Sequence, residues 1–311
     1  MPQSAFSGCS SLTCVTVPEG VTTISSSAFY GCSALRSVSV PDGITSIGWR
    51  AFQGCSSLTS IAIPNGVTYI GDYAFEYCSS LTSVAIPNGV TRLNNGIFDG
   101  CENLISVTIP ESVTSIGFAA FRGCSALSSV HITDLNSWLQ IEYDGFESCP
   151  LVYANHLYLN GVEVESVSFP EGTTSIGSYV LEGGSSIKSI TIPDSVTSIG
   201  DHAFKGCGIA SITIPDSITS IGSGAFSGCT SLASIIIPEN VTSIGSYAFY
   251  SCPSLTSITI KPEVPPAIDE NNITFDYYTE TPIFVPSGSV DTYKASSGWN
   301  RYASRIRAIP E

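Results

Sequence analysis

Cysteine is the most reactive residue type in this chain, and its spacing limits the chemistry that it can do. Ten of the eleven cysteines stand at one position of a recurring motif, three residues after a Phe. They are Cys9, Cys32, Cys55, Cys78, Cys101, Cys124, Cys149, Cys207, Cys229 and Cys252. If successive motifs stack, neighbouring Cβ atoms lie about 4.8 Å apart, beyond the roughly 3.8 Å of a disulfide. A linear row also cannot surround one ion tetrahedrally. We predict a reduced, buried cysteine ladder that holds no metal.

Cys14 is the exception among the cysteines. It stands in a column otherwise held by serine, one residue before an apolar residue that we expect to point inward. Alternate residues of a strand face opposite sides, so the Cys14 thiol is predicted to point to solvent.

Histidine offers the other candidate for catalysis, and the chain has three: His131, His156 and His202. None of them stands in a nucleophile elbow, an HExxH motif or a phosphate loop. A Cys/His or carboxylate site among His131, His156 and Cys149 remains an alternative, with the acids Asp134, Glu142 and Asp144 nearby. Exposed or hydrogen-bonded histidines are the favoured interpretation. We therefore expect a protein that is not an enzyme and uses no cofactor.

The elements that position these residues follow from an internal repeat of 23 residues. Phe recurs at positions 6, 29, 52, 75, 98 and 121, and the pattern resumes at Leu181, Phe204, Phe226 and Phe249, with Phe146 between the two series. A repeat of this length cannot bury its apolar edge alone and must stack on its neighbours. The sequence predicts a repeat solenoid with a parallel β-sheet on one face and short turns or helical turns on the other.

One full unit, CSSLTSIAIPNGVTYIGDYAF, illustrates the expected local structure. Residues 61–63 alternate and are rich in β-branched side chains, which favours a short strand that ends at Pro64. Pro-Asn-Gly then supplies a turn, and residues 67–70 form a second extended segment. Residues 74–78 are too few for a stable helix and are expected to make one tight turn that places Phe75 in the core.

The consensus L-x-x-I-x-I-P-x-x-V-x-x-I-G-x-x-A-F-x-x-C resembles the leucine-rich repeat of the BspA-like bacterial surface proteins. The repeat covers most of the chain. Residues 134–170 resemble an insertion of that family, and residues 284–310 resemble its C-terminal end. The resemblance implies an exported bacterial protein, extracellular or at the cell surface, of a kind implicated in adhesion to host or bacterial surfaces. It implies no particular ligand.

The repeat also suggests how the chain is divided. We expect a leucine-rich repeat solenoid over residues 1–262, with an irregular insertion at about 131–169, and a capping segment over 263–311. Within the insertion, Asp134 is a plausible N-cap of a short helix that carries Leu135, Trp138 and Leu139, and Asn160-Gly161 predicts a two-residue hairpin turn. The sequence starts within a unit, so we expect the natural protein to begin upstream.

Two surfaces compete as the binding face. The outward columns of the sheet are mostly Ser, Thr and Ala, which provide little interface energy. Large side chains gather instead in the x positions of I-G-x-x-A-F-x-x-C, which we call the variable face. The predicted ligand-binding residues there are Trp49, Arg50, Tyr73, Tyr77, Phe118, Tyr179, Tyr247 and Tyr250, with Tyr30 and Arg122 at related positions. The alternative interpretation is that these residues only shield the core beneath them.

Charge limits the partners. The chain carries 26 acidic residues against 11 Lys and Arg, for a formal net charge of −15, which repels phosphate backbones and excludes nucleic acid as a partner. No apolar run is long enough to insert into a membrane. An acidic column after the strand-ending prolines could bind calcium weakly, but one carboxylate per coil favours a solvated ridge.

The sequence therefore predicts a binding or adhesion protein. Its partner would be a protein or a glycan, for instance of a host surface or the extracellular matrix. The alternative is a passive spacer or assembly module for an upstream domain.

Overall fold

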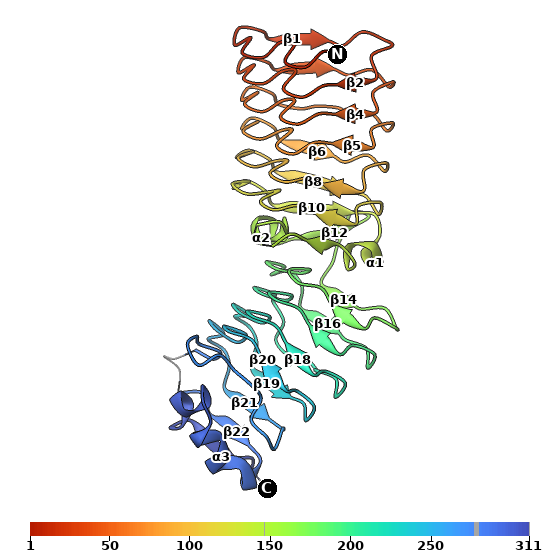
Figure 1. The fold of residues 1–311 in the computed structure, drawn as a ribbon. Coiled ribbons are helices and arrows are strands. Elements are labelled where there is room, and N and C mark those ends of the chain that lie inside the picture. The colour runs from red at the N-terminus through yellow and green to blue at the C-terminus, as the bar shows by residue number, and fades with distance from the viewer. Residues whose placement is uncertain (146, 277–279, 311) are drawn as a thin grey trace. The chain divides into compact units, whose positions relative to one another are not determined.

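The computed structural model describes residues 1–145, 147–276 and 280–310, and within them the chain forms two compact units, Met1–Glu163 and Val164–Glu311. In each unit short strands stack in parallel, coil upon coil, as Figure 1 shows. The predicted solenoid with a parallel sheet is thereby confirmed. Phe146, which we counted as a copy of the repeat, lies outside the described residues.

The coils of the first unit form two rows of strands. The first row contains β1 (Cys14–Thr16), β3 (Ser37–Ser39), β6 (Ser83–Ala85), β8 (Ser106–Ile109), β10 (Ser129–Ile132), β12 (Leu157–Leu159) and β13 (Val162–Glu163). The second row contains β2 (Thr23–Ile24), β4 (Ser46–Ile47), β5 (Tyr69–Ile70), β7 (Arg92–Leu93), β9 (Ser115–Ile116) and β11 (Glu142–Tyr143). The register follows the repeat, since Ser83 pairs with Ser106 and Ser106 with Ser129.

The second unit repeats the arrangement. Its first row contains β14 (Ser166–Ser168), β16 (Ser189–Thr191), β19 (Ser234–Ile237), β21 (Ser257–Ile260), β22 (Ile283–Val285) and β23 (Ile306–Ala308). Its second row contains β15 (Ser175–Ile176), β17 (Ser198–Ile199), β18 (Ser220–Ile221) and β20 (Ser243–Ile244). The boundary at 262/263 stays a prediction, and the parallel ladder extends beyond it, because β22 pairs with β21 and β23 with β22.

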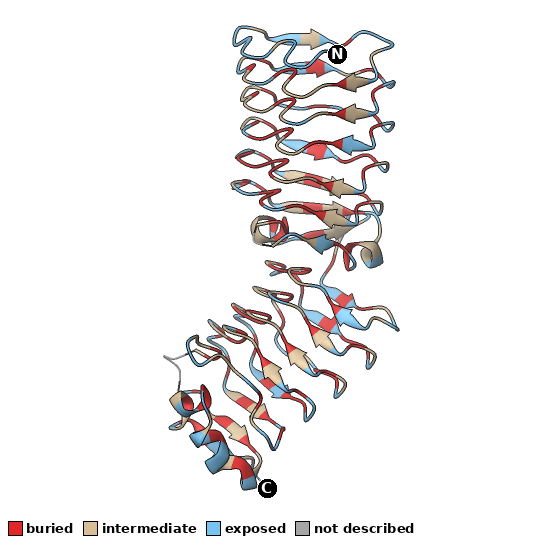
Figure 2. Ribbon diagram, in the orientation of Figure 1, coloured by how far each residue is buried: buried red, intermediate tan, exposed pale blue. Residues whose placement is uncertain are grey.

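The core is a stack of identical side chains rather than a mixed interior. The Phe75 ring is fully buried, with its centroid 5.4 Å from that of Phe52 and 5.7 Å from that of Phe98. Figure 2 shows that buried segments recur from coil to coil. The second unit has a stack of its own, in which the ring of Phe249 lies 5.3 Å from that of Phe226 and 5.6 Å from that of Phe275. Offset aromatic stacking and apolar burial therefore hold each coil to its neighbours.

The expected strand at residues 61–63 is absent, although Ile61 is buried. The backbone there makes only a long contact with the preceding coil, from Thr59 N–H to the Arg36 carbonyl oxygen at 3.5 Å. The strand ladder is interrupted at this coil, while the Phe and Cys columns continue through it. The pairing of β5 (Tyr69–Ile70) with β4 (Ser46–Ile47) in the second row and the stacked Phe side chains keep this coil in register.

The insertion folds as expected. Helix α1 (Leu135–Trp138) begins after Asp134, whose carboxylate accepts a hydrogen bond from Ser137 N–H at 2.7 Å. A second short helix, α2 (Leu151–Ala154), precedes β12. Strands β12 and β13 are antiparallel and are joined by Asn160-Gly161, both with positive φ. The hairpin ends the first unit.

The end of the second unit is closed by aromatic side chains. Helix α3 (Val290–Ala295) and the 3-10 helices η1 (Ser287–Ser289) and η2 (Trp299–Tyr302) precede β23. The buried Tyr302 hydroxyl accepts a hydrogen bond from Thr274 N–H at 3.0 Å, and Trp299 Nε1–H donates to the Pro266 carbonyl oxygen at 2.7 Å. Non-repetitive residues thus cover the last coils.

Candidate binding face

Most thiols of the cysteine column are hydrogen-bonded to backbone carbonyl groups of the preceding coil. Eight thiols of the column donate a hydrogen bond to the backbone carbonyl oxygen of the Phe or Leu that stands 25 or 26 residues earlier. Cys78, for example, donates to Phe52 at 3.2 Å. The donors are Cys32, Cys55, Cys78, Cys101, Cys124, Cys207, Cys229 and Cys252. All eleven cysteines are thiols, and Cys14 is exposed.

Cys9 requires a correction, because we predicted the whole ladder to be buried. Its side chain is exposed in this structure. The physical reason is its position in the first coil: a thiol of this column packs against the coil that carries the residue 25 or 26 positions earlier, and the first coil of this structure has no such coil beside Cys9. The column is buried from Cys32 onward.

The sheet carries small side chains on its outer side. Ser37 and Ser39 of β3 are exposed around the buried Val38, and Ser83 and Ala85 are exposed around Val84. In the second unit an open groove crosses β17, β18 and β20 and is lined by serines and glycines such as Ser220. Neither surface holds the large anchors that concentrate binding energy in interfaces.

The variable face is built on a left-handed backbone residue in each coil. At the second x of I-G-x-x-A-F, φ lies between 53° and 65° at Ser4, Ser27, Arg50, Tyr73, Gly96, Ala119, Tyr179, His202, Gly224 and Tyr247. Ser, Ala and Gly adopt this left-handed conformation in some coils, and Arg or Tyr adopts it in others. A bulky residue in the left-handed region is uncommon and costs of order 1 kcal/mol. Large side chains here are therefore not required by the turn itself.

Trp49, Arg50 and Tyr73 form the most compact cluster of the predicted residues. The Arg50 guanidinium carbon lies 4.2 Å from the centre of the Trp49 ring and 5.7 Å from that of Tyr73. Both distances fit cation–π contacts. Trp49 remains 42% exposed, and the backbone N–H groups of Arg50 and Tyr73 donate to carbonyl oxygens of the next coil at 3.0 and 2.8 Å. The structure thus holds a charged, aromatic surface in place.

The other predicted residues of the first unit do not join this cluster. Tyr77 is 53% exposed, and its ring lies against Gly100, where an added Cβ would come within 2.4 Å of the ring. Phe118 is 49% exposed, and its backbone N–H donates to the Asn95 side chain at 3.0 Å. They are separate exposed rings on the same face.

In the second unit the predicted tyrosines form pairs. Tyr179 stacks on His202 with ring centres 5.3 Å apart, and Tyr247 makes an edge contact with Tyr250 at 5.7 Å. Burial is the main cause that raises the pKa of Tyr179 and lowers the pKa of His202. His202 is therefore held mainly as a neutral stacking partner.

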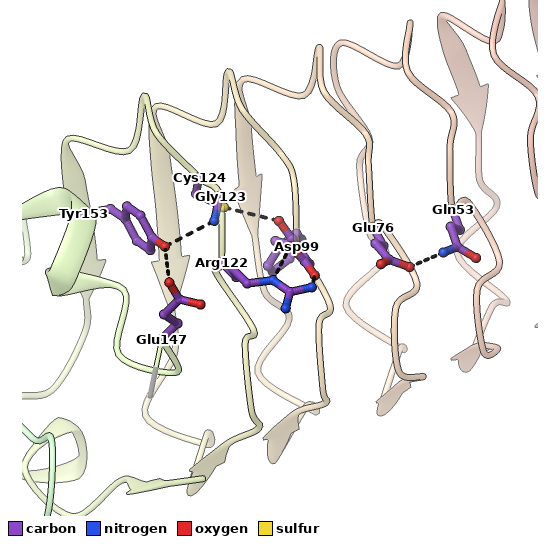
Figure 3. A network of polar contacts seen from close by, with 9 residues as sticks. Gln53, Glu76, Asp99, Arg122, Gly123, Cys124, Glu147 and Tyr153 are labelled. Carbon is purple, nitrogen blue, oxygen red and sulfur yellow. Dashed lines mark hydrogen bonds and ion pairs between the residues drawn. The ribbon is translucent and has the colours of Figure 1, made fainter. Parts of the chain in front are cut away.

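Sequence reasoning missed a column of polar side chains beside the buried Phe stack. Glu76 and Asp99 are 7% and 3% exposed, and each bonds to the column residue of an adjacent coil, Gln53 and Arg122 (Figure 3). Burial and, secondarily, the nearby Asp99 raise the pKa of Glu76. The signal was present in the sequence, since these four residues are spaced by 23.

A second missed group lies on the outer side of the sheet near the hairpin. The His131 and Tyr158 rings, from β10 and β12, stack with centres 5.1 Å apart. His156 Nδ1 lies 2.5 Å from a carboxylate oxygen of Glu163. His131, expected as an interruption of the small column, therefore begins a short aromatic patch on the sheet. The hairpin sequence LYLNGVEVE was the available signal.

Comparison with known proteins decides the family. The model of the BspA-type leucine-rich repeat region matches residues 1–128, 93–156 and 154–272. The chain belongs to the BspA-type leucine-rich repeat family. The family assignment made from the repeat is thus confirmed. No curated protein matches the chain significantly.

Solved structures of bacterial leucine-rich repeat proteins resemble this one. A leucine-rich repeat protein from Bacteroides ovatus is 26% identical, with a TM-score of 0.56 over 100% of this chain and 87% of its own. A leucine-rich cell surface protein from Faecalibacterium prausnitzii is 29% identical, with a TM-score of 0.53 over 96% and 78%. The pneumococcal vaccine antigen PcpA shares the fold at 20% identity, with a TM-score of 0.58 over 95% and 77%.

Two further findings bear on this BspA-type chain. Among residues 1–145, 147–276 and 280–310, no helix is long and apolar enough to cross a bilayer. Within the same residues, no three His, Cys, Asp or Glu side chains gather in a way that could hold a metal ion.

Proposed function

We propose that this chain is a non-enzymatic binding protein that acts outside the cell or at the cell surface and contacts its ligand through the variable face. The cluster of Trp49, Arg50 and Tyr73 carries the proposal, because these side chains are displayed at turn positions where other coils hold Ser, Ala or Gly.

The energetics of interfaces support the choice of face. Trp, Tyr and Arg dominate binding hot spots, and removal of one such anchor typically costs about 2 kcal/mol or more, or roughly thirtyfold in affinity. Truncation of an exposed Ser has little effect by comparison. The variable face concentrates these residue types, whereas the outer columns of the strands are mostly small, with His131, Tyr158 and Ile236 in the first row and Tyr69 in the second row as exceptions.

The location rests on the family and on one relative. The F. prausnitzii structure is named a cell surface protein. We propose the same location here, with a protein or glycan of a host surface or of the extracellular matrix as the partner.

A binding assay on intact surfaces tests the proposal. Labelled protein is applied to host epithelial cells, immobilised matrix proteins and a glycan array. Two double variants are compared with the parent: Trp49→Ala with Tyr73→Ala, and Ser60→Arg with Ser83→Arg. We expect the aromatic pair to lose binding about thirtyfold or more and the arginine pair to keep it. Ala119 occupies the Tyr73 position in its own coil, so that turn accepts alanine.

Two results would count against the proposal. If the arginine pair abolishes binding while the aromatic pair retains it, and both variants give the parent's circular dichroism, the sheet is the ligand face. If the folded parent binds none of the surfaces above an albumin control, the passive spacer is the better account.

A further inference from the structure

The proposed function does not specify the chemical class of the ligand, and the surroundings of Arg50 limit that class. We infer that Trp49, Arg50 and Tyr73 form a subsite for a sugar residue that carries a carboxylate, such as a sialic acid or a uronic acid. This inference rests on the proposed function, because it assigns a ligand class to the same face.

Arg50 combines contacts to two aromatic rings with the absence of a salt bridge, although the Glu76 carboxylate is near enough to interact with it electrostatically. In the described part of the first unit, Arg92 pairs with Asp144 and Arg122 with Asp99, but Arg50 makes no salt bridge. Its Nε is buried without a hydrogen-bond partner, so an external carboxylate bonds to the terminal Nη groups rather than to Nε. Guanidinium groups bind carboxylates strongly through paired, charge-assisted hydrogen bonds. Arg50 therefore has unused capacity for an external carboxylate.

The cluster is also preorganised. The Trp49 and Tyr73 rings contact the guanidinium, at 4.2 and 5.7 Å from its central carbon, and limit its rotation. The left-handed backbone of Arg50 and Tyr73 is secured by hydrogen bonds to the next coil. A ligand that docks here loses little additional side-chain entropy, which favours a small ligand.

A carboxylated sugar suits both parts of this surface. Its carboxylate can bond to Arg50 while the C–H face of its ring packs on the exposed ring of Trp49. Asp72 and Asn95 follow Trp49 at the same position of the next two coils. Asp72 Oδ1 accepts from Asn95 N–H and Asn95 Oδ1 from Phe118 N–H, so Asp72 Oδ2 and the Asn95 side-chain amide nitrogen are the groups offered to sugar hydroxyls. An Asp or Glu side chain of a peptide offers the carboxylate without the adjoining flat face.

The charge of the whole chain argues against larger anions. A formal net charge of −15 repels polyanions at long range, so nucleic acids and heavily sulfated chains are disfavoured. One unpaired guanidinium matches a single carboxylate. The two natural sources, a terminal sialic acid and an internal uronic acid, share this chemistry and are separated by experiment.

Tryptophan fluorescence of the full chain provides a direct measurement. Trp138 and Trp299 are each 1% exposed, so Trp49, at 42%, is the tryptophan that an external ligand can reach. The probes are 3′-sialyllactose, trigalacturonic acid, neutral lactose and an acidic Glu-containing peptide. We expect a saturable change with one or both acidic sugars, at an affinity at least tenfold above that for lactose and for the peptide.

The two variants of the cluster each introduce the residue that stands at the equivalent position of the preceding coil. Arg50→Ser and Trp49→Ser reproduce Ser27 and Ser26, which hold the same positions one coil earlier. We expect Arg50→Ser to weaken acidic-sugar binding at least tenfold and to leave lactose unaffected. Arg36→Ser removes the same charge from an exposed position elsewhere and should change nothing. Binding to Trp49→Ser is followed by isothermal calorimetry, because that variant lacks the reporter.

The possible failures are separable. Equal responses to lactose and to the acidic sugars, tighter binding of the peptide, or unchanged binding by Arg50→Ser would overturn this inference. If the parent binds host surfaces yet no acidic sugar, only the ligand class is wrong. If the acidic sugars bind at Trp49 while no host or matrix surface is bound, the subsite stands and the proposed function fails.

Discussion

The Sγ atom of Cys78 lies 3.2 Å from the backbone carbonyl oxygen of Phe52, to which it donates a hydrogen bond across two adjacent coils. The same bond joins Cys55 to Phe29 at 3.2 Å. Each thiol therefore satisfies a carbonyl at the turn that carries the preceding Phe. Burial raises the pKa of Cys55 to about 12 and that of Cys252 to about 11, because a thiolate there would lose its hydration.

This environment predicts how the thiols react. In native protein at pH 8, a thiol reagent should label the exposed Cys9 and Cys14 quickly and the buried column slowly, since the thiolate is the reactive form. Denatured protein should yield all eleven thiols. Mass spectrometry of labelled peptides makes the assignment. Native labelling of Cys78 at the rate of Cys14, or links between adjacent column cysteines, would contradict the prediction.

The raised pKa values also predict a loss of stability in alkali. An unfolded cysteine ionises near pH 9, whereas Cys55 and Cys124 in the folded chain do so near 12. Between these values the folded state binds more protons, so the free energy of unfolding should fall as the pH rises through this window. Urea melts from pH 7 to 11 measure it. A Cys55→Ala variant, which lacks one such group, should show a smaller decline, and an identical pH dependence would count against the account.

Phe75 shows how the stacked core contributes to stability. Phe75→Ala removes a fully buried ring that contacts Phe52 and Phe98, and should cost about 3 to 5 kcal/mol of unfolding free energy. Coils contact only their neighbours, so the loss should be local at first and divide unfolding into two transitions. Urea titration followed by circular dichroism tests this, with the exposed Ser60→Ala as control. A variant with the parent's midpoint and slope would show that the packing account is wrong.

The sequence was sufficient to predict the repeat and its buried columns, because a period of 23 residues forces equivalent residues to stack. Asp134 and the Asn160-Gly161 turn were likewise predicted from local capping and turn chemistry. Contacts that depend on side-chain conformation were not predicted. The contact of Arg50 with Trp49 depends on rotamers and on a left-handed backbone, which no pattern of residue types specifies.

Other failures have different physical causes. The ladder beyond Pro262 was not predicted because Phe275 follows Phe249 by 26 residues, outside the period. The missing strand at 61–63 reflects hydrogen-bond geometry that propensity does not determine. The polar column of Glu76 and Asp99 was overlooked because only the aromatic and apolar columns, the cysteines and the acids after the strand-ending prolines were compared between copies.

Tyr77 offers a test of whether the variable face is dispensable for folding. Its φ is 57°, whereas Gly54 and Gly100 hold the same position in the flanking coils. Tyr77→Gly relieves a left-handed strain of about 1 kcal/mol and gives up only a half-exposed ring, so the unfolding free energy should change by less than about 1 kcal/mol. Thermal and urea melts measure it. A loss as large as that of Phe75→Ala would make Tyr77 a core residue and weaken its assignment to binding.

Glu76 should make stability depend on pH in the acid range. Its pKa is raised in the folded chain, mainly by burial and then by repulsion from Asp99, while Arg50 and Arg122 oppose the shift. The folded state therefore retains the proton more readily than the unfolded state, and stability that is present below the ordinary value of 4.5 is lost as the pH rises through the folded pKa.

Glu76→Gln removes this titration and keeps the shape of the side chain. A glutamine can still hydrogen-bond to Gln53, so the variant should be more stable than the parent at pH 7, and the difference should shrink toward pH 4. Urea melts at pH 4, 5.5 and 7 measure the difference, with the exposed Glu102→Gln as the matched control. A variant less stable than the parent at pH 7 would mean that the ionised carboxylate is held favourably by Arg50 and Arg122, and that their attraction outweighs burial.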